Sequence, residues 1–244
     1  MELESIQITL NSKFATNYIN GSRSNCEFYL PQIEIPIQHH IYISVHSANI
    51  PYSFYNIDST NNTLIYVISS ISTTITITPG NYNAIQLAAY LQSLMPNFRV
   101  TYNSITNKFT FLNTTYDFAF NTSSKCFSIL GFSNTNVTSI LKSLTSDKCV
   151  NMQTKQCINI MSNFSTGNIS SFDMKSNKML CCIPLNTQPY SNIIYENPSN
   201  FRSNLYTNVI SYLNIMITDQ ENNVLDLNGL DWSLVLQLDI INFV

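Results

Sequence analysis

The sequence has 244 residues, of which 44% are hydrophobic and 10% are charged, and its 11 basic and 14 acidic residues leave a net charge of −3. This length and hydrophobic content are enough to bury a substantial core, which excludes an intrinsically disordered chain. The charged fraction is well below the roughly 25% of an ordinary soluble domain, and uncharged polar residues are abundant instead. The chain has 33 asparagines, 30 serines and 22 threonines, a composition that favours strands and turns over helices.

We expect residues 1–24 to form an N-terminal arm. Ile6, Ile8 and Leu10 alternate with polar residues, which indicates a short extended segment, and a polar stretch around Gly21 separates it from the first clear strand. An extended segment of this kind can add as a strand to an exposed sheet edge of another molecule. We therefore predict that a neighbouring subunit is contacted by Ile6, Ile8, Leu10, Phe14 and Tyr18.

Strand patterns then follow one another. Residues 27–34 and 40–49 are the first two predicted strands, and the second alternates between apolar and polar side chains as a half-buried strand does. Residues 64–69 and 73–78 are the next two, the last of them ending at a Pro-Gly turn.

A helical period replaces the strand pattern after residue 80. Asn83 and Gln86 have the spacing of a capping box and Pro96 ends the pattern, so the sequence predicts one helix over residues 83–95. Its apolar face consists of Ala84, Leu87, Ala88, Leu91 and Leu94.

The helix leads into an aromatic hairpin. Residues 98–102 and 108–112 form its two strands, followed by a strand over 116–120 and a short helical turn over 127–132 that ends at Gly131. Together with the strand before the helix, these elements predict a compact module at about residues 73–132.

The rest of the chain returns to strands. They are predicted at 157–161, 179–184, 193–196, 209–218 and 231–243, with turn chemistry at 219–223 and 228–229. Many short strands with turn signals at roughly ten-residue spacing are typical of a sandwich or barrel. We therefore expect an all-β fold, a single jelly-roll β-sandwich over residues 25–244 with the helix-plus-hairpin module inserted in it.

Several chemistries are excluded by what the chain lacks. Its five glycines are too dispersed for a dinucleotide fingerprint or a phosphate-binding loop, and neither a G-x-S-x-G nor an H-E-x-x-H motif is present. No apolar stretch is long enough to span a membrane, and the basic residues form no cluster that could follow phosphates. We expect no catalytic residue, no cofactor, no membrane span and no direct contact with nucleic acid.

The candidate metal ligands are few. His39 and His40 lie beside Glu34, but adjacent residues on a strand face apart, so we expect exposed histidines and no metal. The sequence begins with no signal-peptide pattern, and no two cysteines have the spacing of a zinc knuckle. We expect reduced thiols at Cys26, Cys126, Cys149, Cys157, Cys181 and Cys182.

Four residues near the end of the sequence are candidates for recognition or hydrolysis of sugars. Asp226, Asp231 and Asp239 could supply paired carboxylates, although acids at turns and strand edges are the more ordinary interpretation. Trp232 is the only tryptophan, and we expect it to pack in the core rather than stack on a sugar.

Five segments carry a resemblance to a known group of proteins. They are IYISVHSANIPYSFYN at 41–56, TPGNYNAIQLA at 78–88, YNSITNKFTF at 102–111, LGF at 130–132 and DLNGLDW at 226–232. The chain resembles minor capsid and penton proteins of large double-stranded DNA viruses, virophages and polinton-like viruses.

The resemblance implies a structural virion protein and no enzyme. In those families the vertex protein is a single jelly roll that forms a homopentamer at the five-fold positions of an icosahedral shell. Its implied partners are further copies of itself, the major capsid protein and other minor capsid proteins, with assembly in the host cytoplasm. Two alternatives stay open: a receptor- or glycan-binding head that uses the asparagine- and tyrosine-rich loops together with Trp232, and a β-sandwich hydrolase that uses Asp231 or Asp226.

Overall fold

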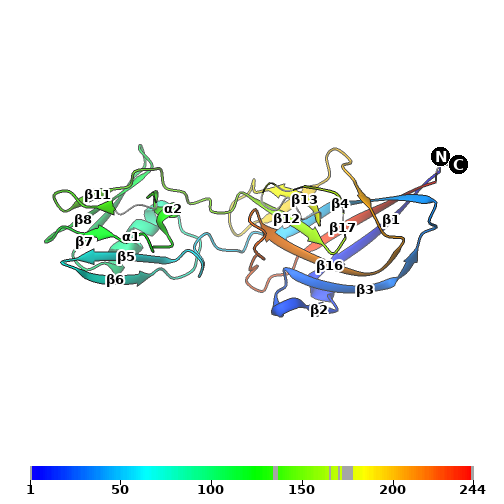
Figure 1. Ribbon diagram of the computed structural model, residues 1–244, viewed down its shortest axis with the longest axis horizontal. Helices are drawn as coiled ribbons and strands as arrows, with labels where there is room; N and C mark the ends of the chain where they lie inside the picture. The colour runs from blue at the N-terminus through cyan, green and yellow to red at the C-terminus, as the bar shows by residue number, and fades with distance from the viewer. Residues whose placement is uncertain (1, 134–136, 165, 170, 172–177, 243–244) are drawn as a thin grey trace. The chain divides into compact units, whose positions relative to one another are not determined.

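The chain forms two compact units. The computed structural model describes residues 2–133, 137–164, 166–169, 171 and 178–242. Unit 1 combines residues 1–54 with 155–244, and unit 2 is the inserted segment 55–154 (Figure 1). Each unit has its own cluster of buried hydrophobic residues.

Unit 1 is a sandwich of two antiparallel sheets. The first sheet has the order β1–β17–β4–β14, and β15 also pairs with β4. Its strands are β1 (Glu2–Asn11), β4 (His39–Pro51), β14 (Asn192–Glu196), β15 (Ser203–Leu205) and β17 (Ser233–Asn242). The second sheet has the order β13–β12–β16–β3–β2. Its strands are β2 (Asn17–Tyr18), β3 (Asn25–Glu34), β12 (Cys157–Ser162), β13 (Met179–Pro184) and β16 (Val209–Asp219).

The strand order identifies a jelly roll. Its eight principal strands are, in chain order, β1, β3, β4, β12, β13, β14, β16 and β17. The first, eighth, third and sixth of these lie side by side in one sheet, and the second, seventh, fourth and fifth in the other. This is the arrangement of two interlocked Greek keys. The predicted fold class is therefore confirmed, and unit 2 is inserted between the third and fourth principal strands.

The core of unit 1 follows from the two-residue period of its strands. On β17, alternate residues from Leu234 to Ile240 are buried, and on β16 the same holds from Leu213 to Ile217. Successive side chains of a strand point to opposite faces, so one face of each sheet supplies the core and the other face stays polar.

The predicted N-terminal arm is a strand of this sandwich. β1 pairs antiparallel with β17 along its whole length, and Ile8 and Leu10 lie opposite Leu236 and Leu234. Both residues belong to the buried core cluster. Two short 3-10 turns follow, Ser12–Phe14 and Ile19–Gly21. The alternation in the sequence shows the extended segment, but its pairing partner lies more than 220 residues away and leaves no local signal.

Unit 2 contains two small sheets and the predicted helix. One sheet consists of β11 (Ser143–Thr145), β8 (Lys108–Asn113) and β7 (Phe98–Asn103). The other consists of β10 (Val137–Thr138), β9 (Ala119–Phe120), β5 (Thr63–Ile68) and β6 (Ile71–Thr76). Helix α1 (Ala84–Leu94) lies against β7, and its buried residues are Ala84, Leu87, Ala88 and Leu91.

Local sequence signals account for both helices of unit 2. The side chain of Asn83 accepts a hydrogen bond from the backbone of Gln86, and the Gln86 side chain accepts one from the backbone of Asn83. This reciprocal pair is the predicted capping box. The short helix α2 (Phe127–Leu130) ends at Gly131, whose φ is 79°. A side chain at Gly131 would collide with the backbone oxygen of Lys148.

Unit 2 is larger than the module predicted at 73–132. It extends beyond that module because β5 pairs with both β6 and β9 and β11 pairs with β8, and its two ends meet where Thr154 Oγ1 donates to the Asn56 carbonyl at 3.1 Å. The strand predicted over 116–120 is shorter, and the last strand begins at Ser233 rather than at residue 231. The predicted end of that strand, Phe243, lies outside the described residues.

The burial of β1 leads to a first prediction. Leu10 is 2% exposed, so Leu10→Asp would place an unpaired charge in the core of unit 1 and lower the free energy of unfolding by more than about 3 kcal/mol. The neighbouring exposed residue provides the control, because Thr9→Asp leaves the charge in water. Urea unfolding followed by circular dichroism measures both. Equal stability of the two variants would show that β1 does not belong to the sandwich.

Candidate functional site

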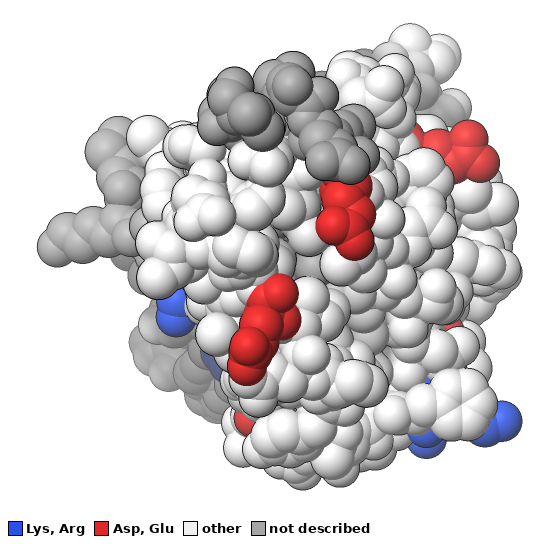
Figure 2. All heavy atoms as spheres, turned by 90° about the vertical axis from the view of Figure 1, so that its right-hand side faces the viewer, with Lys and Arg blue, Asp and Glu red and all other residues white. Residues whose placement is uncertain are grey.

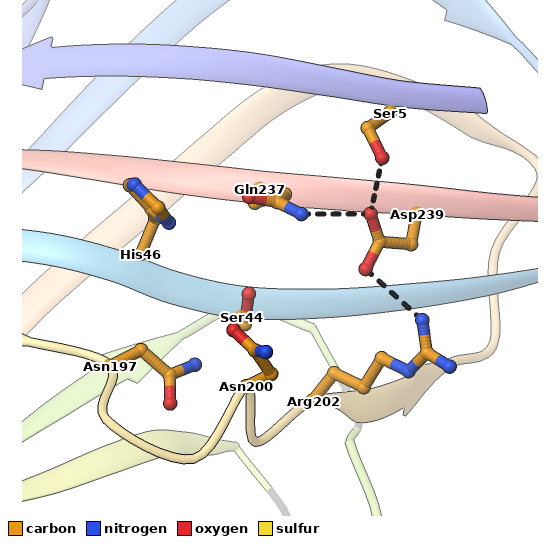
Figure 3. Close-up of a pocket in the computed structure, with 8 residues that line it drawn as sticks. All are labelled: Ser5, Ser44, His46, Asn197, Asn200, Arg202, Gln237 and Asp239. Atoms are coloured by element: carbon orange, nitrogen blue, oxygen red, sulfur yellow. Dashed lines mark hydrogen bonds and ion pairs between the residues drawn. The ribbon is translucent and has the colours of Figure 1, made fainter. Parts of the chain in front are cut away.

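A polar hollow lies on the outer face of the first sheet of unit 1, the face turned away from the core. Its volume is about 370 Å³. Five of its lining residues come from β1, β4 and β17, and three more come from the segment between β14 and β15 (Figure 3). The polar hollow is lined by Ser5, Ser44, His46, Asn197, Asn200, Arg202, Gln237 and Asp239.

Asp239 is the most enclosed charge of the polar hollow. It is 7% exposed and accepts hydrogen bonds from Ser5 Oγ at 2.6 Å and from Gln237 Nε2 at 2.9 Å. The Arg202 guanidinium lies 3.2 Å from its other oxygen and 4.7 Å from the centre of the Tyr42 ring. Burial by itself would raise the pKa of Asp239, but the three donors and the charge of Arg202 outweigh it and lower the pKa.

His46 lies on the same face of β4 as Ser44, two residues away, and it stands at a β-bulge. Val235 lies opposite Ser47 and Leu236 opposite Val45, so His46 is the extra residue on β4. The bulge interrupts the alternation of β4 after His46, so the buried positions change from Ile43 and Val45 to Ala48 and Ile50. His46 is exposed, and Figure 3 shows it at the opposite end of the polar hollow from Arg202.

The segment between β14 and β15 forms one wall of the polar hollow. The Asn197 side chain donates to the Phe201 carbonyl at 2.7 Å and accepts from the Phe201 amide at 3.0 Å. The Asn197 amide in turn donates to the carbonyl of His46 at 3.0 Å. These bonds hold the segment against β4, and Asn200 takes the left-handed conformation, with φ of 51°, that asparagine tolerates.

Each of the three candidate carboxylates has a structural contact of its own, and Asp231 and Asp239 are too far apart to act as a pair. Asp226 accepts from the amide of Asn228 at 2.8 Å in a turn. Asp231 accepts from Ser12 Oγ at 2.8 Å and forms an ion pair with Arg23. The stretch of β17 from Ser233 to Asp239 alone spans about 20 Å at ~3.3 Å per residue, whereas paired carboxylates of glycosidases lie about 5 to 9.5 Å apart. Asp231 and Asp239 therefore serve separate structural contacts.

Trp232 packs in the core, as predicted. It is 1% exposed, and its ring meets the Phe28 ring edge-on with 6.1 Å between centroids. The indole nitrogen donates to the carbonyl of Arg23 at 2.6 Å. Stacking of Trp232 on a sugar is therefore excluded in this fold.

The candidate metal ligands lie on different sheets. His39 and His40 begin β4 in the first sheet, whereas Glu34 ends β3 in the second. Within the described part of the chain, no group of three or more histidine, cysteine and acidic side chains is placed to hold a metal ion. All six cysteines are free, and burial raises the pKa of the thiols of Cys26, Cys126 and Cys181 to about 12.

The five residues predicted to contact a neighbouring subunit have different environments. Ile8 and Leu10 are buried, and Ile6 and Tyr18 pack against the same core. Phe14 is 75% exposed in the turn after β1. The subunit contact stays a prediction, and the structure leaves Phe14 as its most accessible residue.

The sequence interpretation missed the polar hollow. Alternation along β4 places Ser44 and His46 on one outer face, which is a usable signal. The folded-back segment at Asn197 depends on contacts between distant parts of the chain and has no local signal. The ion pair between Arg202 and Asp239 likewise has no local signal in the sequence.

Among the described residues, no helix is long and apolar enough to cross a membrane.

Comparison with known proteins shows the fold of this chain. No model of a known protein family matches the sequence, and no curated protein matches it. A solved structure, that of the selenomethionine-labelled mavirus penton protein, is similar, with a TM-score of 0.55 and 14% identity over 99% of this chain and 100% of that chain. The fold is therefore like that of a penton protein, and the resemblance noted in the sequence is confirmed at the level of fold.

The contacts of Asp239 predict how stability depends on pH. Because the folded-state pKa lies below the ordinary value of 3.8, the ionised carboxylate stabilises the fold above that pH, and this contribution is lost as the pH falls through the folded-state pKa. Asp239→Asn should cost about 1 to 3 kcal/mol at neutral pH, and the difference from the wild type should shrink toward pH 2. Thermal unfolding across this pH range measures it.

The exposed loop carboxylate offers a matched control for this measurement. Asp226→Asn removes a charge of the same kind, and Asp226 forms no ion pair with any described residue, so its loss in free energy of unfolding should be smaller at neutral pH. If the difference in stability between the wild type and Asp239→Asn stayed constant down to pH 2, this would contradict the role assigned to the Arg202–Asp239 contact.

Proposed function

We propose that this chain is a structural capsid protein that forms the five-fold vertices of an icosahedral virus particle. The observation that carries the proposal is the fold: a jelly roll with an inserted unit, similar to a penton protein over 99% of this chain and 100% of that one. Jelly rolls also occur in lectins and enzymes, so the fold alone does not decide the function. The surface and the candidate sites supply further support.

The surface of unit 1 suits contacts between copies. Figure 2 shows that charged side chains are sparse on the face turned to the viewer. Removing uncharged polar groups from water costs less free energy than removing charges. The centres of protein interfaces are accordingly depleted of charged residues. Several large apolar or aromatic side chains of unit 1 are exposed, among them Phe14, Tyr29, Ile37, Ile194 and Tyr206.

The candidate sites of unit 1 favour a structural role over hydrolysis. Asp226 and Asp231 each hold a local structural contact, and Asp239 is neutralised by Arg202. In this proposal the partners of the chain are its own copies around a five-fold axis, the major capsid protein and other minor capsid proteins. Its location is the virion, with assembly in the host cytoplasm.

The number of copies tests the proposal. A closed ring around a five-fold axis has cyclic symmetry, so purified protein should form a species with five times the mass of the 27.7 kDa chain. Mass photometry over a range of concentrations, with five-fold class averages in electron microscopy, gives the result. A monomer or a dimer at every concentration, alone and with the major capsid protein, would contradict the vertex assignment.

Phe14 offers a separate test of where the copies meet. Phe14→Ser removes an exposed aromatic side chain without opening the core, so the fold should keep its stability while association weakens by about tenfold or more. The matched control is Ile105→Ser, an exposed apolar residue of unit 2. If Phe14→Ser associates as strongly as the wild type, the region around β1 does not belong to the interface. The five-fold assembly is then tested by the mass measurement alone.

A further inference from the structure

We propose that the polar hollow of unit 1 binds one sugar residue of a neutral glycan. Its volume of about 370 Å³ lies within the range of about 300 to 1,000 Å³ that is usual for sites of small ligands. Such sites are mostly apolar, whereas all eight residues that line this one have polar side chains. An apolar ligand would leave these groups without hydrogen bonds, so the ligand must itself offer many polar groups.

The charges of the polar hollow favour a neutral ligand. Its acid and its arginine, Asp239 and Arg202, lie 3.2 Å apart and neutralise each other. An anion placed beside Arg202 would face the Asp239 carboxylate, and a cation beside Asp239 would face the guanidinium. A charged ligand would therefore be repelled by one of these two groups while the other attracts it. A neutral ligand avoids this repulsion.

Three side chains of the polar hollow have hydrogen-bonding capacity that the protein does not use. Ser44 is 8% exposed, and its hydroxyl makes no hydrogen bond to any described residue. Within the same described ranges, the side chains of His46 and Asn200 also have no hydrogen-bond partner. Figure 3 shows Ser44 and Asn200 next to each other and His46 beyond them, on the rim of one cavity.

The unused groups match the chemistry of a sugar. Asn200 offers both donors and acceptors, and the Ser44 hydroxyl can act as either. The nitrogen of the Gln237 side chain donates to Asp239, which leaves its oxygen to accept a hydrogen bond from a ligand. Each sugar hydroxyl is likewise one donor and an acceptor, so several hydroxyls fixed on one ring can satisfy this mixture at once. His46 adds a flat ring at one end of the polar hollow.

This inference does not rest on the five-fold assembly. It concerns the outer face of one sheet of unit 1, and a monomer presents the same eight residues. It gives a physical basis to the alternative of a glycan-binding head, with the polar hollow in place of Trp232 as the recognition site. A vertex protein that binds a glycan would satisfy both proposals.

The experiment is a titration of the full chain with galactose, glucose, mannose and N-acetylglucosamine, observed by saturation-transfer NMR. At least one of these neutral sugars should bind saturably, with a dissociation constant of about 0.1 to 10 mM, the range expected for a single small polar ligand. Glucosamine and sialic acid, which carry opposite charges, should bind at least tenfold more weakly.

Two variants locate the binding. Ser44→Val removes the buried hydroxyl and narrows the polar hollow, and His46→Ala removes an exposed ring, so each should weaken sugar binding by tenfold or more. His46→Ala carries the test if Ser44→Val fails to fold, because His46 is exposed. The control is Asn49→Ala, an exposed residue of the same strand that does not line the polar hollow.

Three results would overturn the inference. One is the absence of saturable binding by every neutral sugar, and another is an equal loss in Asn49→Ala. The third is a change in the mass of the assembled protein in the Ser44 and His46 variants with sugar binding intact, which would make the polar hollow a contact between copies. A failed pentamer with intact sugar binding would instead contradict only the vertex proposal.

Discussion

The pairing of β1 with β17 is the interaction on which the rest of unit 1 depends. It joins segments more than 220 residues apart in ten antiparallel residue pairs, from Glu2 opposite Asn242 to Asn11 opposite Ser233. The pairing places Ile8 and Leu10 in the core and completes the first sheet of the jelly roll. It also brings Ser5 to Asp239, so the same contact that closes the sandwich builds the polar hollow on its outer face.

A polar cluster fixes the end of this pairing. Ser12 donates through its hydroxyl to Asp231 and accepts from the amide of Trp232, while its own amide donates to the Trp232 carbonyl at 2.9 Å. Arg23 pairs with Asp231, and its carbonyl accepts from the indole. Burial alone would raise the pKa of Asp231, but the hydrogen bonds from Ser12 and Arg23 and the charge of Arg23 lower it. The register of β1 is therefore set by specific polar contacts as well as by apolar burial.

Patterns over a few neighbouring residues predict the helix α1 and most of the long strands. The capping box at Asn83 and the helical spacing of Leu87 and Leu91 predict α1, and period-two alternation predicts most long strands, so the jelly-roll class is accessible from the sequence. The role of β1 and the polar hollow are not, because both arise where distant strands meet. The bulge at His46 exists only relative to the register of β17, and Arg202 meets Asp239 only once the segment before β15 lies against the first sheet. Asp231 and Trp232, which were candidates because of their chemistry, have structural roles instead, because both contact Ser12 and Arg23 from the distant N-terminal part of the chain.

The central claim is that this jelly roll occupies the five-fold vertices of a capsid, and its position in the particle tests that most directly. Cryo-electron microscopy of particles that contain this chain would resolve the density at each symmetry axis. The account predicts five copies of unit 1 around every five-fold axis, recognisable by the two sheets and by β1 paired with β17. Density of this chain only at other positions of the shell, or no ordered copies in the particle, would contradict it.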